Sequence, residues 1–308
     1  MEKEKPKISI IIPSYNHSKY IKQTIHSIWN QVYKNIEIIV VDDHSSDSSV
    51  SKLKVLQQNS PSPFILHVNQ ENYGISQTLN KALELCTGDL VCFIASDDYF
   101  SEDRFTSAIQ LFQSSKTLKL VYSNGRELIG NNIGEEIHRK KVKQLLASPP
   151  KTILNFLYTN VSPIFLQTAL IDAHFLKETG GFNGNILADD WYLNTRMFEQ
   201  ISEKNEYTFD DTIVIYYRRH PNNIHKNTQR HSALKMQFID KVTPKNLKKD
   251  AYFNILSAMA FEELKKRNWS ASAAYHWEAQ RHKANLLLLI KYLLKALLKS
   301  LQFSPSKG

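Results

Sequence analysis

The chain has 308 residues, of which 42% are hydrophobic and 22% are charged, with 14 Tyr, 15 Phe and 4 Trp. This composition excludes a disordered, collagen-like or low-complexity chain, and the length suits two domains or one large α/β domain with an appendage. Two cysteines, Cys86 and Cys92, cannot build a disulfide framework or a four-cysteine zinc site. Because the charged N-terminus lacks the apolar stretch of a signal peptide, we expect a reducing, cytoplasmic location.

The formal net charge of +9 is concentrated near the C-terminus. Residues 279–308 contain six Lys and Arg and no Asp or Glu, and lysines recur every four residues from 291 to 299 beside a leucine-rich surface. This predicts a basic amphipathic helix over residues 283–302. Its longest apolar run is far shorter than the roughly twenty residues that cross a bilayer. The pattern fits a helix that packs on the globular body or a second subunit, or one that lies on a membrane surface. A basic face with interleaved aromatic platforms is missing, so we expect no nucleic-acid partner.

From residue 8 the chain alternates strand-like and helix-like segments. Continuous apolar, β-branched runs predict four strands, at residues 8–12, 36–41, 64–68 and 90–95. Helical spacing predicts helices between them, at residues 20–29, 50–56 and 75–85. This alternation predicts an α/β fold with a Rossmann-like, mostly parallel sheet covered by helices on both faces. Ligands of such sheets bind at the carboxyl ends of the strands, which is where we expect the chemistry.

The alternation weakens after residue 122, where we expect an elaboration of the same sheet. That part includes a helix that begins near Asp189 and a strand over residues 212–217. From about residue 233 to the end the pattern is helical, including residues 252–266 and 271–282.

Two pairs of acidic residues follow predicted strands, Asp42 with Asp43 and Asp97 with Asp98. Neighbouring carboxylates repel each other and raise each other's pKa unless a cation or hydrogen-bond donors meet them. Hard oxygen ligands suit Mg²⁺ or Mn²⁺ shared with ligand phosphates, which we expect for the second pair. For the first pair and the Ser and Asp residues after it, capping of the next helix is an alternative. A dinucleotide oxidoreductase and a P-loop NTPase are excluded, because neither glycine-rich phosphate-binding motif is present.

The order of the motifs resembles the family 2 glycosyltransferases over about residues 8 to 227. The opening ISIIIPSYNHSKYIKQTIHSIWNQVYKNIEIIVVDDHSSD matches the family's first strand, turn, helix and second strand with its double Asp. Further motifs follow in the family's order: Asn72-Tyr73-Gly74 through Asn80, Gly88-Asp89, Ser96-Asp97-Asp98, Gly180-Gly181-Phe182, Asp189-Asp190-Trp191, and Tyr217-Arg218-Arg219-His220. The resemblance implies the GT-A fold. It would place a nucleotide-binding half in residues 1–123, an acceptor-binding half in 124–228, and a helical extension with the basic amphipathic helix in 229–308.

The resemblance also implies roles for individual residues. Those implied to bind the nucleotide are Pro13, Tyr15, Asp43, Asn72, Gly74 and Asp97, with Asp98 as the metal ligand for Mn²⁺ or Mg²⁺. Asp190 would be the catalytic base, with Asp189 and Trp191 on the acceptor side, and Arg218 and His220 would contact the diphosphate or the metal. Judged by spacing alone, Asp189 and Asp190 suit the N-cap of a helix with a salt bridge to Arg196. Two positions depart from the family pattern, because Ala95 replaces its first metal-binding carboxylate and Leu79 replaces a common arginine.

These roles imply a metal-dependent, inverting transfer of a sugar from a nucleotide sugar. We expect a UDP-sugar, because UDP is the commonest donor nucleotide in the family. The acceptor would be a hydroxyl of a glycan or a lipid-linked glycan on the inner face of the cytoplasmic membrane. The two departures keep open an alternative from another class, a non-catalytic nucleotide-sugar-binding or assembly protein on the same fold. Both the transferase and the non-catalytic protein could form an oligomer.

Overall fold

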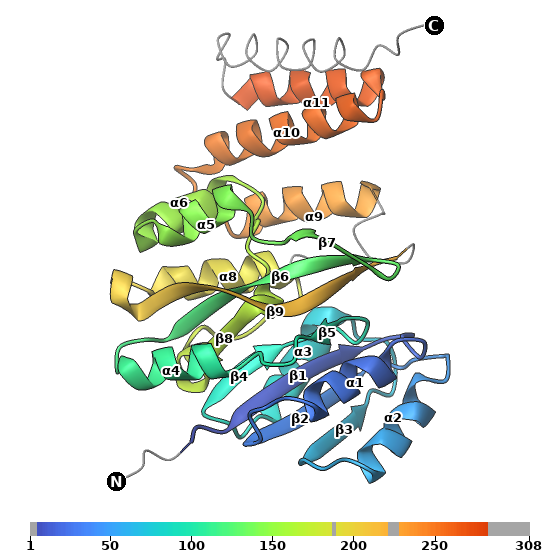
Figure 1. The fold of residues 1–308 in the computed structure, drawn as a ribbon. Helices are drawn as coiled ribbons and strands as arrows, with labels where there is room; N and C mark the ends of the chain where they lie inside the picture. Colours follow the sequence, from blue (N-terminus) through green and yellow to red (C-terminus); the bar gives the residue numbers. More distant parts are fainter. Residues whose placement is uncertain (1–4, 187–188, 221–227, 283–308) are drawn as a thin grey trace, which may run out of the picture. The chain divides into compact units, whose positions relative to one another are not determined.

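The structure, a computed structural model, describes residues 5–186, 189–220 and 228–282 (Figure 1). The chain divides into two compact units. One comprises Met1–Leu154 and Ser162–His231, and the other comprises Asn155–Val161 and Ser232–Gly308.

The first unit is built on one nine-stranded sheet, in the order β3-β2-β1-β4-β8-β6-β9-β5, with β7 paired to β6. Its strands are β1 (Ile8–Ser14), β2 (Ile36–Asp42), β3 (Phe64–Val68), β4 (Leu90–Phe93), β5 (Tyr99–Phe100), β6 (Leu120–Ile129), β7 (Asn132–Glu136), β8 (Ala169–Asp172) and β9 (Tyr207–Arg219). The helices between them are α1 (Ile21–Trp29), α2 (Ser49–Gln58), α3 (Ile75–Glu84), α4 (Thr106–Ser114), α5 (Lys140–Ala147), α7 (Ala173–Glu178) and α8 (Asp189–Gln200). Helix α6 (Pro150–Thr159) begins in the first unit, and its residues from 155 on belong to the second. Two short 3-10 turns, η1 (Leu166–Thr168) and η2 (Lys204–Glu206), complete the list.

The strand directions confirm an α/β fold with a mostly parallel sheet at its centre. Strands β3, β2, β1 and β4 are parallel neighbours, and β6 is parallel to β9. The second half of the unit extends the same sheet, as expected, but it does so through β8, which is antiparallel to both β4 and β6. Strands β5 and β7 are also antiparallel to their partners. The sheet is therefore mixed at the point where the two halves join.

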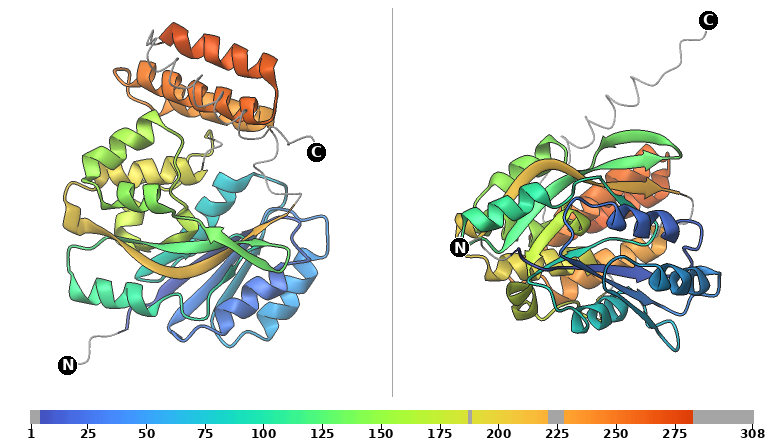
Figure 2. Two further views of the ribbon diagram at one scale, coloured as in Figure 1. Left: turned by 45° about the horizontal axis from the view of Figure 1, so that its top comes forward. Right: turned by 60° about the horizontal axis from the view of Figure 1, so that its bottom comes forward.

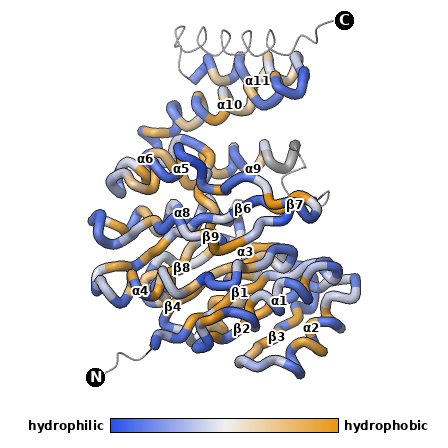
Figure 3. Tube along the Cα trace, viewed as in Figure 1, coloured by the Kyte–Doolittle hydropathy of each residue, from blue (hydrophilic) through white to orange (hydrophobic). Residues whose placement is uncertain are grey.

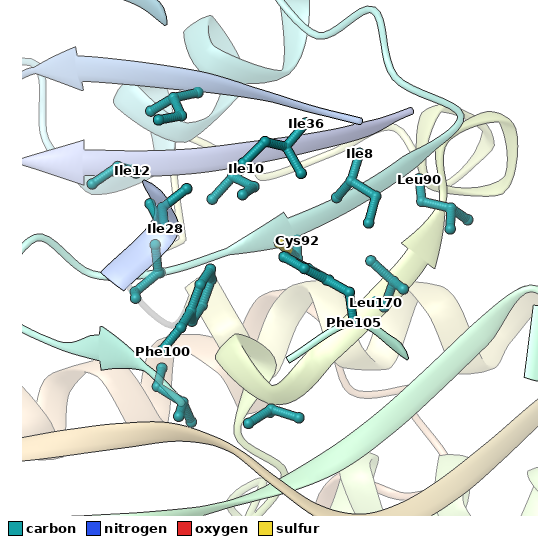
Figure 4. Close-up of a cluster of buried hydrophobic side chains, with 14 of the residues drawn as sticks. Ile8, Ile10, Ile12, Ile28, Ile36, Leu90, Cys92, Phe100, Phe105 and Leu170 are labelled. Carbon is teal, nitrogen blue, oxygen red and sulfur yellow. The ribbon is translucent and has the colours of Figure 1, made fainter. Parts of the chain in front are cut away.

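The core explains why the apolar runs become central strands. Alternate residues of β1, namely Ile8, Ile10 and Ile12, are fully buried in one cluster with the apolar faces of α1 and α2 (Figure 4). Helix α3 contacts β1 and β2 on the opposite face, so both faces of these strands are covered (Figure 1 and Figure 2). Figure 3 shows hydrophobic stretches along these strands. Because such strands lack a solvent face, their sequences are almost entirely apolar, and two buried exceptions, Ser9 and Glu37, hydrogen-bond to each other.

The second unit contains helices α9 (Thr228–Lys241), α10 (Lys248–Lys265) and α11 (Trp269–His282). Helices α10 and α11 pack together, and the Ser272 hydroxyl of α11 donates to the Ala260 carbonyl of α10 at 2.8 Å. The expected helical C-terminal part is therefore present, while the amphipathic helix expected at 283–302 lies outside the described residues. Within the described part of the chain, every helix is too short or too polar to cross a bilayer.

Candidate functional site

The loops after β1 and β2 are tied together at one edge of the sheet. The register of the two strands places Ser14 beside Asp42, so both chains leave the sheet at the same point. Asn16 has a positive φ of 55°, and its side-chain oxygen accepts hydrogen bonds from the backbone of Ser46 at 2.8 Å and of Asp47 at 3.3 Å. Asparagine tolerates this left-handed conformation better than most residues. The turn after β1 and the acidic loop after β2 thus form one unit.

The carboxylate of Asp43, which the resemblance assigned to nucleotide binding, is held by hydrogen bonds from the protein. Asp43 is 5% exposed. One oxygen accepts from the Asn69 amide at 2.9 Å and from the Tyr73 backbone at 2.8 Å, and the other accepts from the Gly74 backbone at 2.8 Å. Gly74 has φ 86°, a conformation that favours glycine. A carboxylate offers about four lone-pair sites, and at least three of them accept bonds that fix the loop over residues 69–74.

The other residues predicted for this pocket differ in exposure. Tyr15 is 47% exposed and Asn72 is exposed, whereas Pro13 is partly buried at the end of β1. Leu79 is buried at 4% exposure. Pro13, Tyr15 and Asp43 therefore lie on neighbouring strand ends, and Asn72 and Gly74 lie in the loop that Asp43 holds.

Three side chains that could hold a metal ion converge after β1, β4 and β9. His17, Asp97 and His220 each offer one ligand atom, and these atoms lie within 4.8 Å of one another. The Nε2 atom of His220 is 2.8 Å from Oδ2 of Asp97, and Nε2 of His17 is 3.8 Å from the same oxygen. The Nδ1 atom of His17 lies 2.7 Å from the Ser96 hydroxyl, which fixes the ring. We call these three residues the His17–Asp97–His220 cluster.

The chemistry of this donor set fits a divalent transition ion. Burial lowers the pKa of His17, although Asp97 opposes this effect, so the ring is neutral and keeps a lone pair at neutral pH. Two imidazoles with one carboxylate suit an ion such as Mn²⁺ better than Mg²⁺, which prefers oxygen ligands only. The site therefore fits the metal expected from the sequence, and His17 and His220 join Asp97 as its candidate ligands.

Asp98, the residue predicted to bind the metal, is fully buried and already has partners. Its Oδ1 accepts from the Arg218 backbone at 2.7 Å, and its Oδ2 accepts from the Gln167 amide at 2.9 Å. Burial and then the neighbouring Asp97 raise the pKa of Asp98 well above its usual range, and these two hydrogen bonds oppose the rise. Asp98 therefore lies directly beside the cluster without belonging to it.

Arg218 is held against the same turn. Its Nε donates to the Asp97 carbonyl at 2.8 Å, and its guanidinium donates to the Gln23 side chain at 2.7 Å. The guanidinium lies 4.8 Å from the centre of the Tyr20 ring, and the His220 ring stacks on Tyr20 at 5.2 Å. Arg218 and His220, predicted to contact the diphosphate or the metal, thus both lie beside Asp97.

Asp189 and Asp190, which the resemblance assigned to the acceptor side and to the catalytic base, begin helix α8. Burial and then Asp189 raise the pKa of Asp190 well above its usual range, while a hydrogen bond from the Leu166 backbone lowers it. Burial also raises the pKa of Asp189. Arg196 forms an ion pair with Glu199. Trp191 is 4% exposed, so it packs in the interior at the start of the helix.

Carboxylates from both parts of the predicted site act electrostatically on Tyr217. Burial is the main cause of its raised pKa, and Asp98, Asp97 and Asp190 all raise it further. Because a phenol responds only to charges near it, the carboxylates after β4 and the carboxylate at the start of α8 are within electrostatic range of one ring. Residues predicted for the metal side and for the acceptor side therefore act on the same ring.

Three residues of this site were not predicted from the sequence. His17 follows the first strand directly, so its place at the strand edge could have marked it. Tyr20 was expected only as part of a helix. Gln167 lies in η1, in a part of the sequence without a clear helix or strand pattern, and no local signal distinguishes Gln167 from its neighbours. Each of the three contacts the predicted residues across the fold.

A model of the family described as glycosyl transferase family 2 matches residues 9–176. Relatives include the chondroitin synthase of Escherichia coli, 33% identical over 127 residues, which are 41% of this chain and 18% of the relative. The glycosyltransferase GlyA of Streptococcus pneumoniae is 40% identical over 97 residues, which are 32% of this chain and 14% of the relative. An uncharacterized glycosyltransferase of Rickettsia bellii is 26% identical over 272 residues, which are 84% of this chain and 38% of the relative. The chain spans less than half the length of each of these relatives.

Two solved structures share the fold. The mannosyltransferase PcManGT of Pyrobaculum calidifontis, in complex with GDP-Man and Mn²⁺, gives a TM-score of 0.62 at 20% identity, covering 96% of this chain and 81% of that one. Residues 1–349 of TarS from S. aureus, in complex with UDP, give a TM-score of 0.57 at 17% identity, covering 90% and 92%. These likenesses extend the agreement in fold well beyond the residues that the family model matches. The match of the family model to more than half of the chain shows that the chain belongs to glycosyl transferase family 2.

Proposed function

We propose that this glycosyltransferase moves a sugar from a nucleotide diphosphate sugar to a hydroxyl of a glycan or lipid-linked glycan, with inversion and with the help of Mn²⁺. A UDP-sugar is the donor we favour. The observation that carries the proposal is that adjacent residues of η1 link the His17–Asp97–His220 cluster to Asp190. Gln167 donates to Asp98, the neighbour of Asp97, and the Leu166 backbone donates to Asp190. A transferase needs these two groups together, because charge develops on the leaving diphosphate while the acceptor hydroxyl loses a proton.

On the donor side, the chain's own residues would hold the nucleotide and the ion. Pro13, Tyr15 and the loop fixed by Asp43 would frame the base, and Asp97 with the two histidines would hold the ion beside the diphosphate. Arg218, anchored by Asp97 and Gln23, would add positive charge there. When bound, a divalent ion supplies Lewis-acid stabilisation of the leaving diphosphate.

On the acceptor side, Asp190 is the base in this proposal. Its raised pKa makes it a stronger proton acceptor than an ordinary carboxylate. The N-terminus of α8 and the Leu166 backbone both favour its ionised form, so the carboxylate can still lose its proton. Attack by a hydroxyl on the face opposite the diphosphate predicts inversion at the anomeric carbon.

The first test is a thermal-shift panel of UDP, GDP, dTDP and CDP, each with no metal, with Mg²⁺ and with Mn²⁺. A ligand that binds only the folded state raises the melting temperature. We expect a shift with UDP that is largest with Mn²⁺, and Asp97→Asn should remove the metal-dependent part. If none of the nucleotides gives a shift with either metal, the proposed donor site is wrong.

The second test separates an enzyme from the non-catalytic alternative. Asp190→Asn should lower turnover of UDP-N-acetylglucosamine and GDP-mannose by about 10² to 10⁴ while leaving nucleotide binding unchanged. Glu199→Gln, a neutralised carboxylate on the same helix, is the matched control and should retain turnover. Nucleotide binding without turnover of either donor by the unaltered protein would favour the binding protein. Full turnover in Asp190→Asn would reject Asp190 as the base.

We also propose that the enzyme works at the inner face of the cytoplasmic membrane, attached by its C-terminal part. Residues 279–308 carry six Lys and Arg and no acidic residue. Just before them, α11 displays Trp269 at 65% and Trp277 at 72% exposure. Tryptophan is enriched where membranes meet water, and basic amphipathic segments bind anionic lipids. A lipid-linked acceptor would be reached from such a position.

A further inference from the structure

The short turn η1 contacts β4, β6 and β9, which carry both halves of the site. Within it, the Gln167 side chain bridges the two ends of the turn after β4. Its oxygen accepts from the Ala95 backbone at 2.6 Å, and its nitrogen donates to Oδ2 of Asp98 at 2.9 Å. The Asp98 backbone also donates to the Ala95 carbonyl at 3.1 Å, which closes the turn. Gln167 therefore holds the turn that presents Asp97 to the two histidines of the cluster.

The neighbouring residue of η1 holds the other half of the site. The Leu166 backbone donates a hydrogen bond to Asp190, and Leu166 itself is 1% exposed. The turn is fixed from behind as well, because the Phe165 backbone donates to Nε2 of His138 at 3.0 Å. The Phe165 ring meets the Tyr217 ring edge-on at 5.0 Å. Residues 165–167 thus form one segment that contacts both Asp98 on the donor side and Asp190 on the acceptor side.

We propose that Gln167 is a positioning residue, which sets the distance between the turn that carries Asp97 and the base Asp190. The inference rests on the proposed function, in which these two carboxylates serve opposite sides of one reaction. Ala95 has no polar side chain with which to fix the turn, so the bond from its backbone to Gln167 replaces such an anchor. A misplacement of about 1 Å between reacting groups costs about a hundredfold in rate.

Two substitutions separate the two bonds of Gln167. Gln167→Met keeps the size of the side chain and removes both bonds. Gln167→Glu keeps an oxygen for the Ala95 backbone but places an acceptor, in place of a donor, against Asp98. Gln57→Met is the matched control, because Gln57 is also partly buried and donates to the Phe64 carbonyl at 2.9 Å, on helix α2 away from the site.

The variants are compared in the full chain by three measurements. Hydrogen exchange followed by mass spectrometry reports the Ala95 amide, calorimetry reports UDP binding as a function of Mn²⁺ concentration, and hydrolysis of UDP-N-acetylglucosamine and GDP-mannose reports kcat and KM. For Gln167→Met we expect faster exchange at Ala95, a higher Mn²⁺ requirement and a kcat about a hundredfold lower. For Gln167→Glu we expect slow exchange at Ala95 together with the lower kcat. Gln57→Met should match the unaltered protein in all three.

The outcomes distinguish this inference from the proposed function. If Asp190→Asn abolishes hydrolysis but Gln167→Met keeps the kcat and Mn²⁺ requirement of the unaltered protein, the role of Gln167 is refuted and the proposed function stands. If Gln167→Met and Gln57→Met lower the melting temperature and kcat equally, the effect is general destabilisation, and the positioning role is also refuted. If Asp190→Asn hydrolyses both donors at the full rate, Asp190 is rejected as the base, and the inference fails with that assignment.

Discussion

His138 makes the stability of the protein depend on pH in a way that can be worked out from its surroundings. The ring is fully buried, with Nδ1 at 2.8 Å from the Ser123 carbonyl and Nε2 accepting from the Phe165 backbone at 3.0 Å. One nitrogen must therefore donate and the other accept, which only the neutral ring can do. Burial lowers the pKa of His138 to about 4, with a smaller lowering by Lys143 and opposing effects of Ser123 and Asp211.

The direction and size of the effect follow from the two pKa values. The pKa of a histidine in the unfolded chain is 6.5, so between pH 6.5 and about 4 the unfolded chain binds a proton that the folded protein does not. Stability is therefore lost as the pH falls through this window. At about 1.4 kcal/mol per pKa unit, the full loss is about 3 kcal/mol, of which about 2 kcal/mol falls between pH 7 and pH 5.

Urea unfolding followed by circular dichroism at pH 7 and pH 5 measures this effect. His138→Gln keeps a donor and an acceptor but does not titrate, so its free energy of unfolding should fall by about 2 kcal/mol less than that of the unaltered protein over the same interval. His174→Gln, at a side chain that is 85% exposed, is the control. Equal losses in His138→Gln and the unaltered protein would refute the reasoning, whatever their absolute stabilities.

Two further predictions concern the glycine turn before α8 and the surface of α11. Gly181 has φ 70°, and a Cβ atom there would lie 2.8 Å from the Asn80 side-chain oxygen, so Gly181→Ala should destabilise the protein by more than about 1 kcal/mol in urea unfolding. Gly184→Ala, where a Cβ would meet only ordinary contacts, should change stability little, and equal effects would contradict the argument. Replacing Trp269 and Trp277 by Ser should weaken sedimentation with phosphatidylglycerol vesicles by about tenfold or more, because burial of a large apolar side chain contributes about 1.5–3 kcal/mol. Unchanged sedimentation would show that these two side chains do not contact the membrane.

The sequence by itself determined the central strands and the edge at which the site lies. The runs over 8–12 and 36–41 are apolar except at Ser9 and Glu37 because β1 and β2 are covered on both faces, and that requirement is visible in each strand separately. The sequence also indicated that the two acidic pairs lie near each other, because each pair follows a predicted strand and parallel strands end at one edge of the sheet. The family match confirms the family resemblance. The resemblance implies roles for these residues that hydrophobic periodicity cannot indicate.

Only the tertiary structure decided which side chains meet. Sequence patterns report whether a residue is buried, whereas partners come from packing between elements far apart in the chain. His220 lies 123 residues from Asp97, and Gln167 lies 69 residues from Asp98 and 72 from Ala95. The antiparallel insertion of β8 between β4 and β6 brings η1 between the two halves of the sheet. That placement, which no local pattern encodes, joins the donor-side turn to Asp190.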